Sequence, residues 1–191
     1  SPPRVTVMML VYNAAEYLRL SMDCVLNQTF DDFELLIIDD GSTDSSPDIV
    51  CSYSDSRIRM IRNPVNRGVS WSRQRALELA GGEYIAVLDS DDLSDLKRFQ
   101  AQVDYLDRHP DIDVVGSAFE IIDKDGRPVR TVRVPTDPVA IRWKLLFGDC
   151  IGHSTVMYRR EHALQVGNYD ERVLTGEDFD LWVRFAAHGK I

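Results

Sequence analysis

The sequence is poor in cysteine and has no long apolar run. Its 191 residues include three cysteines, Cys24, Cys51 and Cys150, which are widely spaced and form no CxxC pair. A scattered, odd-numbered set argues against a disulfide framework or a zinc site and favours a reducing, cytoplasmic location. No stretch approaches the roughly 20 apolar residues that span a bilayer. The first residues, Ser1 to Arg4, also lack the apolar segment of a signal peptide.

Basic residues are scarce relative to acidic ones. Lys and Arg total 22 against 31 Asp and Glu, which gives a formal charge of −9. A protein that holds nucleic acid through its phosphates needs a basic face, so nucleic-acid binding is disfavoured. A small phosphorylated ligand remains compatible if a metal cation or a local arginine cluster meets its phosphates. The length and composition suit one globular domain.

The first half alternates between strand-like and helix-like patterns. Continuous apolar runs rich in β-branched residues predict buried strands at 5–11, 33–38, 58–61 and 84–88. Apolar residues recur at helical spacing after the first run, from Leu18 to Leu26, and after the fourth, from Leu96 to Leu106. Residues 69–79 are also predicted to form a helix. This alternation is typical of a parallel sheet covered by helices.

The second half has a different pattern. Residues 114–122, a turn at 123–126 and residues 129–134 predict a β-hairpin. A helix around 139–146 and a strand at 155–158 are expected next. Three helix starts are predicted from polar residues: Ser46 before Pro47, Ser94, and Thr175 with Asp178 as a capping box.

Two predicted strands end in acidic clusters, Asp39-Asp40 and Asp89-Ser90-Asp91-Asp92. Ligands of open α/β sheets bind at the carboxyl ends of strands, where the two clusters would meet. Carboxylates on one edge repel each other unless a cation or ligand lies between them, and oxygen ligands suit Mg²⁺ or Mn²⁺ better than zinc. The alternative is that Asp and Gly merely end the strands in turns.

Other polar residues have a functional and a structural interpretation. Arginines at 62, 67, 73 and 75 could bind a pyrophosphate or nucleobase, or form a solvated helix face. Glu177 or Asp178, at the start of the last helix, could act as a general base, or the acids could simply favour the helix N-terminus. His153 is either a structural donor or a ligand.

Taken in order, these motifs resemble those of the family 2 glycosyltransferases, inverting enzymes of the GT-A fold. Each motif is weak alone, but the ordered set covers essentially the whole chain. The matching motifs are the opening strand with Tyr12-Asn13, Phe33 to Asp44 (FELLIIDDGSTD), Asn66-x-Gly68 with Arg73, Asp89-x-Asp91 and Glu177-Asp178. Leu10 departs from the pattern, since relatives often carry proline or a small polar residue there.

The resemblance implies an α/β fold of the Rossmann-like GT-A type, with a mostly parallel central sheet flanked by helices and a small antiparallel C-terminal part. One domain, 1–191, would consist of a nucleotide-binding half at 1–108 and an acceptor-binding half at 109–191. A stop at Ile191, directly after a helix predicted to end at His188-Gly189, favours a longer natural protein.

The resemblance also implies a reaction and roles for residues. A sugar would pass with inversion from a UDP-sugar to a saccharide or lipid-linked acceptor, in the cytoplasm or at the inner face of the membrane. Asp89 and Asp91 would hold Mg²⁺ or Mn²⁺, with His153 as a further candidate ligand. Asp178 would be the general base and Glu177 the second candidate. The nucleotide would be bound by Tyr12, Asp39, Asp40, Asn66, Gly68, Arg73 and Asp89.

Three alternatives to a transferase are open. A nucleotide-sugar-binding module without turnover would keep the same motifs, and UDP binding without donor hydrolysis would identify it. A metal-dependent phosphatase that uses Asp89 and Asp91 would normally carry this pair after its first strand. A nucleotidyltransferase would begin with a glycine-rich, basic loop instead of residues 11–15.

Overall fold

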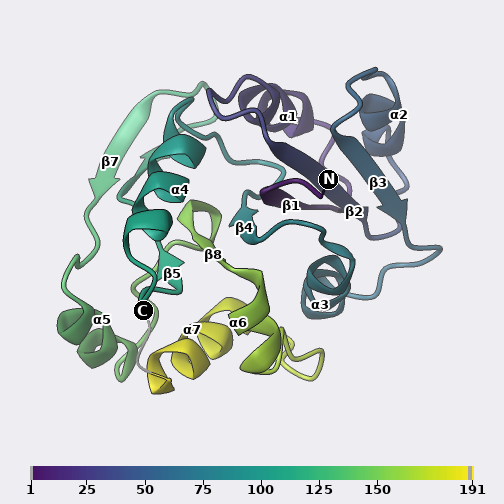
Figure 1. Ribbon diagram of the computed structural model, residues 1–191. Coiled ribbons are helices and arrows are strands. Elements are labelled where there is room, and N and C mark those ends of the chain that lie inside the picture. The colour runs from purple at the N-terminus through teal and green to yellow at the C-terminus, as the bar shows by residue number, and fades with distance from the viewer. Residues whose placement is uncertain (1, 189–190) are drawn as a thin grey trace.

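Six strands form the central sheet in the order β3-β2-β1-β4-β8-β5, in a computed structural model that describes residues 2–188 and 191 (Figure 1). The first four strands of the chain run parallel, and β8 and β5 extend the sheet in antiparallel pairings. The predicted α/β architecture with a mostly parallel sheet is therefore confirmed. The strands are β1 (Val5–Val11), β2 (Phe33–Asp39), β3 (Ile58–Arg62), β4 (Tyr84–Val87), β5 (Val114–Val115) and β8 (Met157–Arg159).

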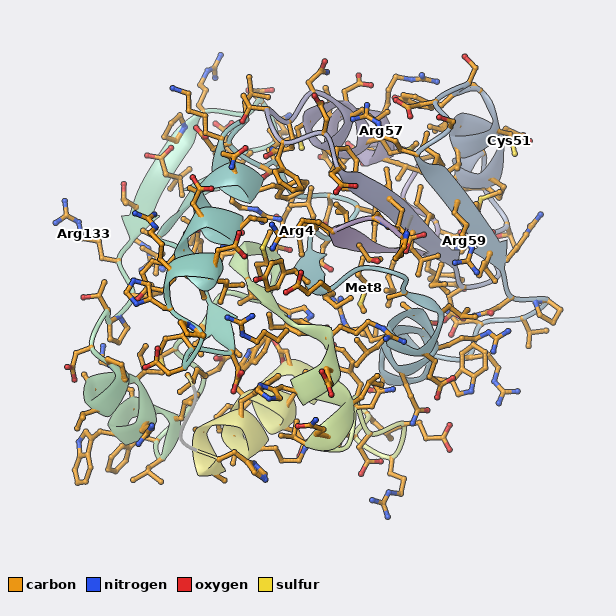
Figure 2. The ribbon with its side chains drawn as sticks, in the orientation of Figure 1. Arg4, Met8, Cys51, Arg57, Arg59 and Arg133 are labelled. Atoms are coloured by element: carbon orange, nitrogen blue, oxygen red, sulfur yellow. The ribbon has the colours of Figure 1, made fainter. Side chains whose placement is uncertain are left out.

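Helices cover both faces of the sheet because successive strand residues point to opposite sides. In β1, Val7 and Met9 belong to one hydrophobic core and Met8 to the other, and all three are fully buried. Figure 2 shows Met8 within the molecule and Cys51, one of three free cysteines, at its surface. The first core includes α1 (Leu18–Leu26), α2 (Ser46–Cys51) and α4 (Arg98–Arg108); the second includes α3 (Val69–Leu79), α5 (Pro138–Leu145), α6 (Arg160–Gln165) and α7 (Glu177–Ala187).

The hairpin expected from 114–134 is present in a shorter form. β6 (Phe119–Ile122) pairs with β7 (Pro128–Val132) as a separate two-stranded sheet. The prediction of one strand over 114–122 was wrong, because β5 pairs with β8 in the central sheet. β8 is only three residues long, so this pairing ends at Val115 and the chain leaves the sheet before β6 begins.

Two predicted helix starts are wrong because tertiary contacts use the polar groups. The N-cap of α2 is Ser45, while Ser46 Oγ accepts a hydrogen bond from Ala14 N at 2.9 Å. α4 begins at Arg98, and Ser94 Oγ instead accepts a hydrogen bond from Gln28 Nε2 at 3.3 Å.

The third predicted helix start is also wrong. The N-cap of α7 is Gly176 in a left-handed conformation, and no side chain forms the expected capping box. Asp178 Oδ1 accepts from Phe179 N at 2.8 Å. The predicted end of this helix at Gly189 lies outside the described residues. Among the helices of the described residues, none has the length and apolarity that a membrane crossing requires.

Candidate active site

The turn after β2 is a rigid support for the neighbouring loop. Asp40 is buried, with 4% of its surface exposed. Its carboxylate accepts hydrogen bonds from Asn63 Nδ2 at 2.7 Å and from the backbone N–H groups of Arg67 and Gly68, both at 2.9 Å. A carboxylate offers about four acceptor positions. Asp40 therefore holds the 63–68 loop and keeps about one position for a ligand.

The adjacent Asp39 is fully buried at the end of β2. Its Oδ1 accepts a hydrogen bond from Ser42 N at 3.0 Å, and its Oδ2 lies 3.0 Å from Arg62 Nε. The contacts of Asp39 therefore stabilise the turn itself. On the far side of this turn, Asn13 Oδ1 accepts from Thr43 N at 2.8 Å, which ties the turn after β1 to the turn after β2.

Glycines allow the loop and the turn to approach each other. A Cβ on Gly41, whose φ is +79°, would lie 2.7 Å from the carbonyl carbon of Val65. Gly68 has a φ of +91°, and its N–H also lies 3.0 Å from Asn66 Oδ1. Because L side chains rarely adopt such φ values, glycine is favoured at both positions. Beside this packed loop, the side chain of Tyr12 is half exposed.

Arg73, from α3, connects the two acidic motifs. Its side chain is 6% exposed; Nη2 donates to Asp89 Oδ1 at 2.8 Å and Nε to Glu177 Oε1 at 3.2 Å. Burial alone would lower the pKa of Arg73, but the carboxylates, Asp89 above all, outweigh it and raise the pKa. Nη1 is buried and has no hydrogen-bond partner within the described part of the chain. Arg73 is thus a fixed cation with one unused donor group.

Asp89 follows β4, and Ser154 orients its carboxylate together with Arg73. Ser154 Oγ donates to Asp89 Oδ2 at 3.0 Å and accepts from the backbone N of Asp89 at 3.1 Å. Burial would raise the pKa of Asp89, but the charge of Arg73 and these hydrogen bonds lower it. The carboxylate is therefore held ionised, with about a third of its surface, 34%, exposed.

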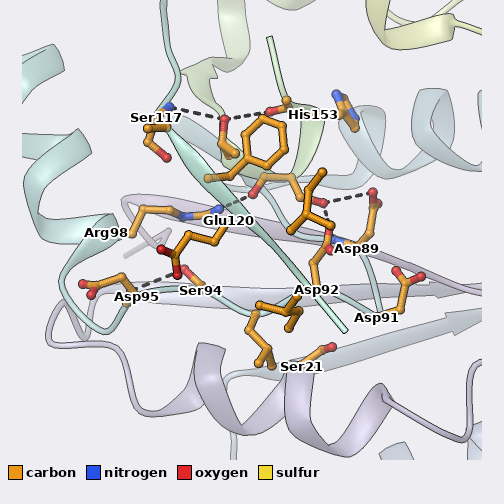
Figure 3. Close-up of a pocket in the computed structure, with 18 of the residues that line it drawn as sticks. Ser21, Asp89, Asp91, Asp92, Ser94, Asp95, Arg98, Ser117, Glu120 and His153 are labelled. Atoms are coloured by element: carbon orange, nitrogen blue, oxygen red, sulfur yellow. Dashed lines mark hydrogen bonds between the residues drawn. The ribbon is translucent and has the colours of Figure 1, made fainter. Parts of the chain in front are cut away.

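Asp91 lies on the exposed side of the same loop (Figure 3). An exposed carboxylate beside the ionised Asp89 supplies the oxygen donors that Mg²⁺ and Mn²⁺ prefer. No group of three His, Cys, Asp or Glu side chains is assembled as a metal site among the described residues. Two carboxylates still fit a Mg²⁺-like ion, because such ions keep water and substrate phosphate oxygens as their other ligands.

His153 lies in the short helical turn η1 (His153–Thr155), beside Trp182 and Tyr169. Its Nε2 is 3.5 Å from the hydroxyl of Tyr169, whereas Nδ1 is buried without a hydrogen-bond partner in the described residues. Burial and then the charge of Arg73 lower the pKa of His153 well below 6.5. The imidazole is consequently neutral at pH 7.

Two cavities meet at His153. The larger, of about 1410 Å³, lies between α1, α4 and the β6–β7 hairpin and is lined by Asp89 and Asp91 (Figure 3). The smaller, of about 460 Å³, is lined by Asp178 and Asp149. His153 lines both. Burial, with a contribution from Asp178, raises the pKa of Asp149.

The structure brings most of the predicted residues to one edge of the sheet. The two acids at the start of α7, however, have different neighbours. Asp89 and Glu177 share Arg73, while Asp178 faces the smaller cavity. Sequence reasoning missed Arg98, which donates to the backbone carbonyl groups of Val87 and Ser154 beneath the Asp89 loop. Burial lowers the pKa of Arg98 to about 10. An arginine at the first turn of a helix gives no sequence signal for that role.

A family model and two related sequences all indicate a glycosyltransferase. The family model described as glycosyl transferase family 2 matches residues 6–165. A glycosyltransferase of Methanocaldococcus jannaschii, described as uncharacterized, is 32% identical over 97% of this chain and 66% of its own length. The UDP-Glc:alpha-D-GlcNAc-diphosphoundecaprenol beta-1,3-glucosyltransferase WfgD of Escherichia coli is 31% identical over 94% of this chain and 68% of its own length.

Solved structures share the fold. Staphylococcus aureus TarS in complex with UDP superimposes with a TM-score of 0.76 at 23% identity, covering 93% of this chain and 53% of TarS 1–349. The mannosyltransferase PcManGT of Pyrobaculum calidifontis, in complex with GDP-Man and Mn²⁺, gives 0.75 at 20% identity, covering 100% of this chain and 54% of its own. The present chain thus spans about two thirds of the length of these curated relatives and about half of these solved chains.

Proposed function

The chain belongs to glycosyl transferase family 2, and on that premise we propose that it transfers a sugar, with inversion, from a UDP-sugar to a saccharide or lipid-linked acceptor. The observation that carries this proposal is the position of Arg73 between Asp89 and Glu177. One buried cation joins the motif proposed for the donor to the helix that carries the proposed base.

The donor would bind along the carboxyl ends of β1, β2 and β4. The remaining acceptor position of Asp40 and the half-exposed ring of Tyr12 suit a nucleobase, whose edge offers N–H donors and whose face can stack. The unused Nη1 of Arg73 suits an anionic oxygen. UDP is proposed because the relative WfgD is named for UDP-Glc.

Asp89 and Asp91 would hold a divalent cation together with the donor diphosphate. When bound, such a cation supplies Lewis-acid stabilisation of the charge that develops on the leaving diphosphate. Arg73 and Ser154 fix the orientation of Asp89 before any ligand arrives, so less conformational freedom is lost on binding. PcManGT, a neighbour with the same fold, is described with Mn²⁺.

Asp178 would take the proton from the acceptor hydroxyl as that oxygen attacks the anomeric carbon from the face opposite the leaving diphosphate. Oδ1 already accepts the N–H of Phe179, which leaves Oδ2 for the acceptor. Glu177 forms an ion pair with Arg73. In this proposal Glu177 therefore positions Arg73 and does not take the proton. A cytoplasmic location fits a nucleotide-sugar donor and is proposed with it.

Titration calorimetry of UDP and GDP, with and without Mn²⁺, tests the donor side. We expect Mn²⁺-dependent binding of UDP that Asp91→Ala removes, while Asp48→Ala, an exposed acid on α2, leaves binding unchanged. Preference for GDP would overturn the donor assignment. Binding without slow hydrolysis of any UDP-sugar would favour the second candidate function, a nucleotide-sugar-binding module that keeps the motifs without turnover.

A further inference from the structure

Helix α5 buries one face and leaves an apolar face open. Leu145 is 4% exposed and belongs to the core on the α7 side of the sheet. Four apolar side chains on the other face are exposed, at spacings of i, i+4, i+7 and i+8, which place them on one side of a helix. These are Val139 (71% exposed), Trp143 (64%), Leu146 (72%) and Phe147 (78%), and we name them the α5 outer stripe.

The outer stripe is a formed surface and not a set of scattered side chains. Trp143 and Phe147 pack edge to face with ring centroids 5.6 Å apart. Leu146 and Phe147 continue the helical turn, since Leu146 N donates to the carbonyl oxygen of Trp143 and Phe147 N to that of Lys144. Single exposed apolar residues are common on proteins, but contiguous patches mark sites of interaction.

Basic residues accompany the stripe in an acidic chain. Residues 133–149 contain three basic residues, Arg133, Arg142 and Lys144, and two acids, Asp137 and Asp149, although the whole chain carries a formal charge of −9. Asp137 is occupied as the N-cap of α5, accepting from Ala140 N at 2.8 Å. Figure 2 shows Arg133 pointing away from the molecule on the side where Figure 1 places α5.

The stripe is close to the candidate active site along the chain and in space. Lys144, from α5, and Arg133 line the smaller cavity, which also includes Asp178 and His153. A partner that contacts the basic side chains of this region would therefore lie at the rim of the cavity that contains the proposed base.

We propose that the α5 outer stripe inserts into the headgroup region of an anionic lipid bilayer, with Arg133 and Lys144 near the lipid phosphates. An apolar face that carries Trp and Phe beside Lys and Arg is typical of helices that lie in the membrane interface. A second copy of the chain suits the surface less well. A twofold contact through this patch would place the basic side chains of both copies in one interface, where their like charges repel each other.

This attachment goes beyond the transfer reaction and does not require it, so it is measured without donor or metal. The whole chain is mixed with vesicles of neutral phosphatidylcholine, or with vesicles that contain roughly one third phosphatidylglycerol. We expect cosedimentation with the anionic vesicles, a weaker interaction with neutral ones, and a blue shift of tryptophan emission. Trp143, with 64% of its surface exposed, would be the reporter.

Two double variants separate the apolar and electrostatic contributions. Leu146→Ser with Phe147→Ser, which keeps the reporter, should reduce partitioning by about tenfold or more, because binding scales with buried apolar area. Arg133→Ser with Lys144→Ser should reduce it roughly fivefold for each charge, and only on anionic vesicles. The matched control is Leu174→Ser, which removes an apolar side chain with 90% exposure outside the stripe and should bind like the parent.

The proposal is overturned if the parent chain does not cosediment with anionic vesicles, or if both double variants bind as strongly as the control. A concentration-dependent dimer without lipid binding, lost in Leu146→Ser with Phe147→Ser, would reassign the stripe to a contact between copies. Thermal unfolding of each variant accompanies the assay. If the apolar variant fails to fold, the charge variant still decides the outcome. Inactivity toward UDP-sugars would contradict the proposed function and leave this result unaffected.

Discussion

Oε1 of Glu177 lies 3.2 Å from Nε of Arg73, so the two acids of the Glu177-Asp178 pair have different surroundings. Glu177 is held in an ion pair with a side-chain exposure of 12%, whereas Asp178 lines a cavity. The same arginine contacts Asp89. Substitution of Arg73, Glu177 or Asp178 should therefore have a different effect on stability, UDP binding and turnover.

Removal of the shared cation should destabilise the fold. Arg73→Ala leaves Asp89 and Glu177 without their counter-charge, and the loss of one partner of a buried ion pair costs about 3–5 kcal/mol. We expect this loss in the free energy of unfolding measured with urea, together with weaker binding of UDP. Arg75→Ala, which removes a partly exposed arginine stacked on Trp71, is the control. Equal effects of the two substitutions would contradict the role assigned to Arg73.

Substitutions of Asp178 and Glu177 should affect turnover and UDP binding differently. Asp178→Asn removes the proposed base and should lower turnover about 10²–10⁴-fold, with UDP affinity nearly intact. Glu177→Gln weakens the contact with Arg73 and should lower stability and UDP affinity as well. Calorimetry and a donor-consumption assay on both variants check this. Loss of UDP binding in Asp178→Asn would make that residue structural.

Two glycines with similar backbone angles should respond differently to substitution. Gly126→Ala in the hairpin turn (φ +77°) meets no atom of the described residues within 4 Å and should cost about 1–2 kcal/mol from the left-handed backbone alone. Gly41→Ala (φ +79°) adds a clash with the backbone of Val65 and should cost about 1–3 kcal/mol more. Urea unfolding of both variants measures the difference. Equal costs would mean that the 63–68 loop moves freely away from the turn.

The folded state should lose stability in alkaline solution, in part through Tyr84. Burial, and then its hydrogen bond to Asp107 at 2.7 Å, raise the pKa of Tyr84 from 10 to about 12. The neutral phenol is favoured in the folded state, so its contribution is complete below pH 10 and is lost as the pH rises toward 12. Tyr84→Phe should reduce the pH dependence of the urea midpoint in this window. It should not remove that dependence, because the pKa values of Tyr53, Tyr158 and Tyr169 are raised as well. Tyr105→Phe, at a side chain with 40% exposure, should not. A parent chain of constant stability up to pH 12 would contradict this assignment.

Local patterns in the sequence were sufficient for much of the fold. β1 and β2 were predicted because short, continuous apolar runs suit strands that are buried on both faces, and both strands are largely buried. The acids after β2 and β4 reach one edge because parallel strands end on the same side of a sheet. The hairpin turn at 123–126 was likewise evident from its own residues.

Tertiary structure decided what the polar groups contact. Asp40 binds the N–H groups of a loop 27 and 28 residues away in sequence, and Arg73 contacts Glu177 across 104 residues. The hydroxyl of Ser46 was predicted as a cap and instead accepts from Ala14. A hydroxyl or guanidinium has several equivalent local uses, and its partner is chosen only when distant segments pack together. The sequence therefore determined the elements and the position of the acidic motifs, while the packing of distant segments determined which charges meet.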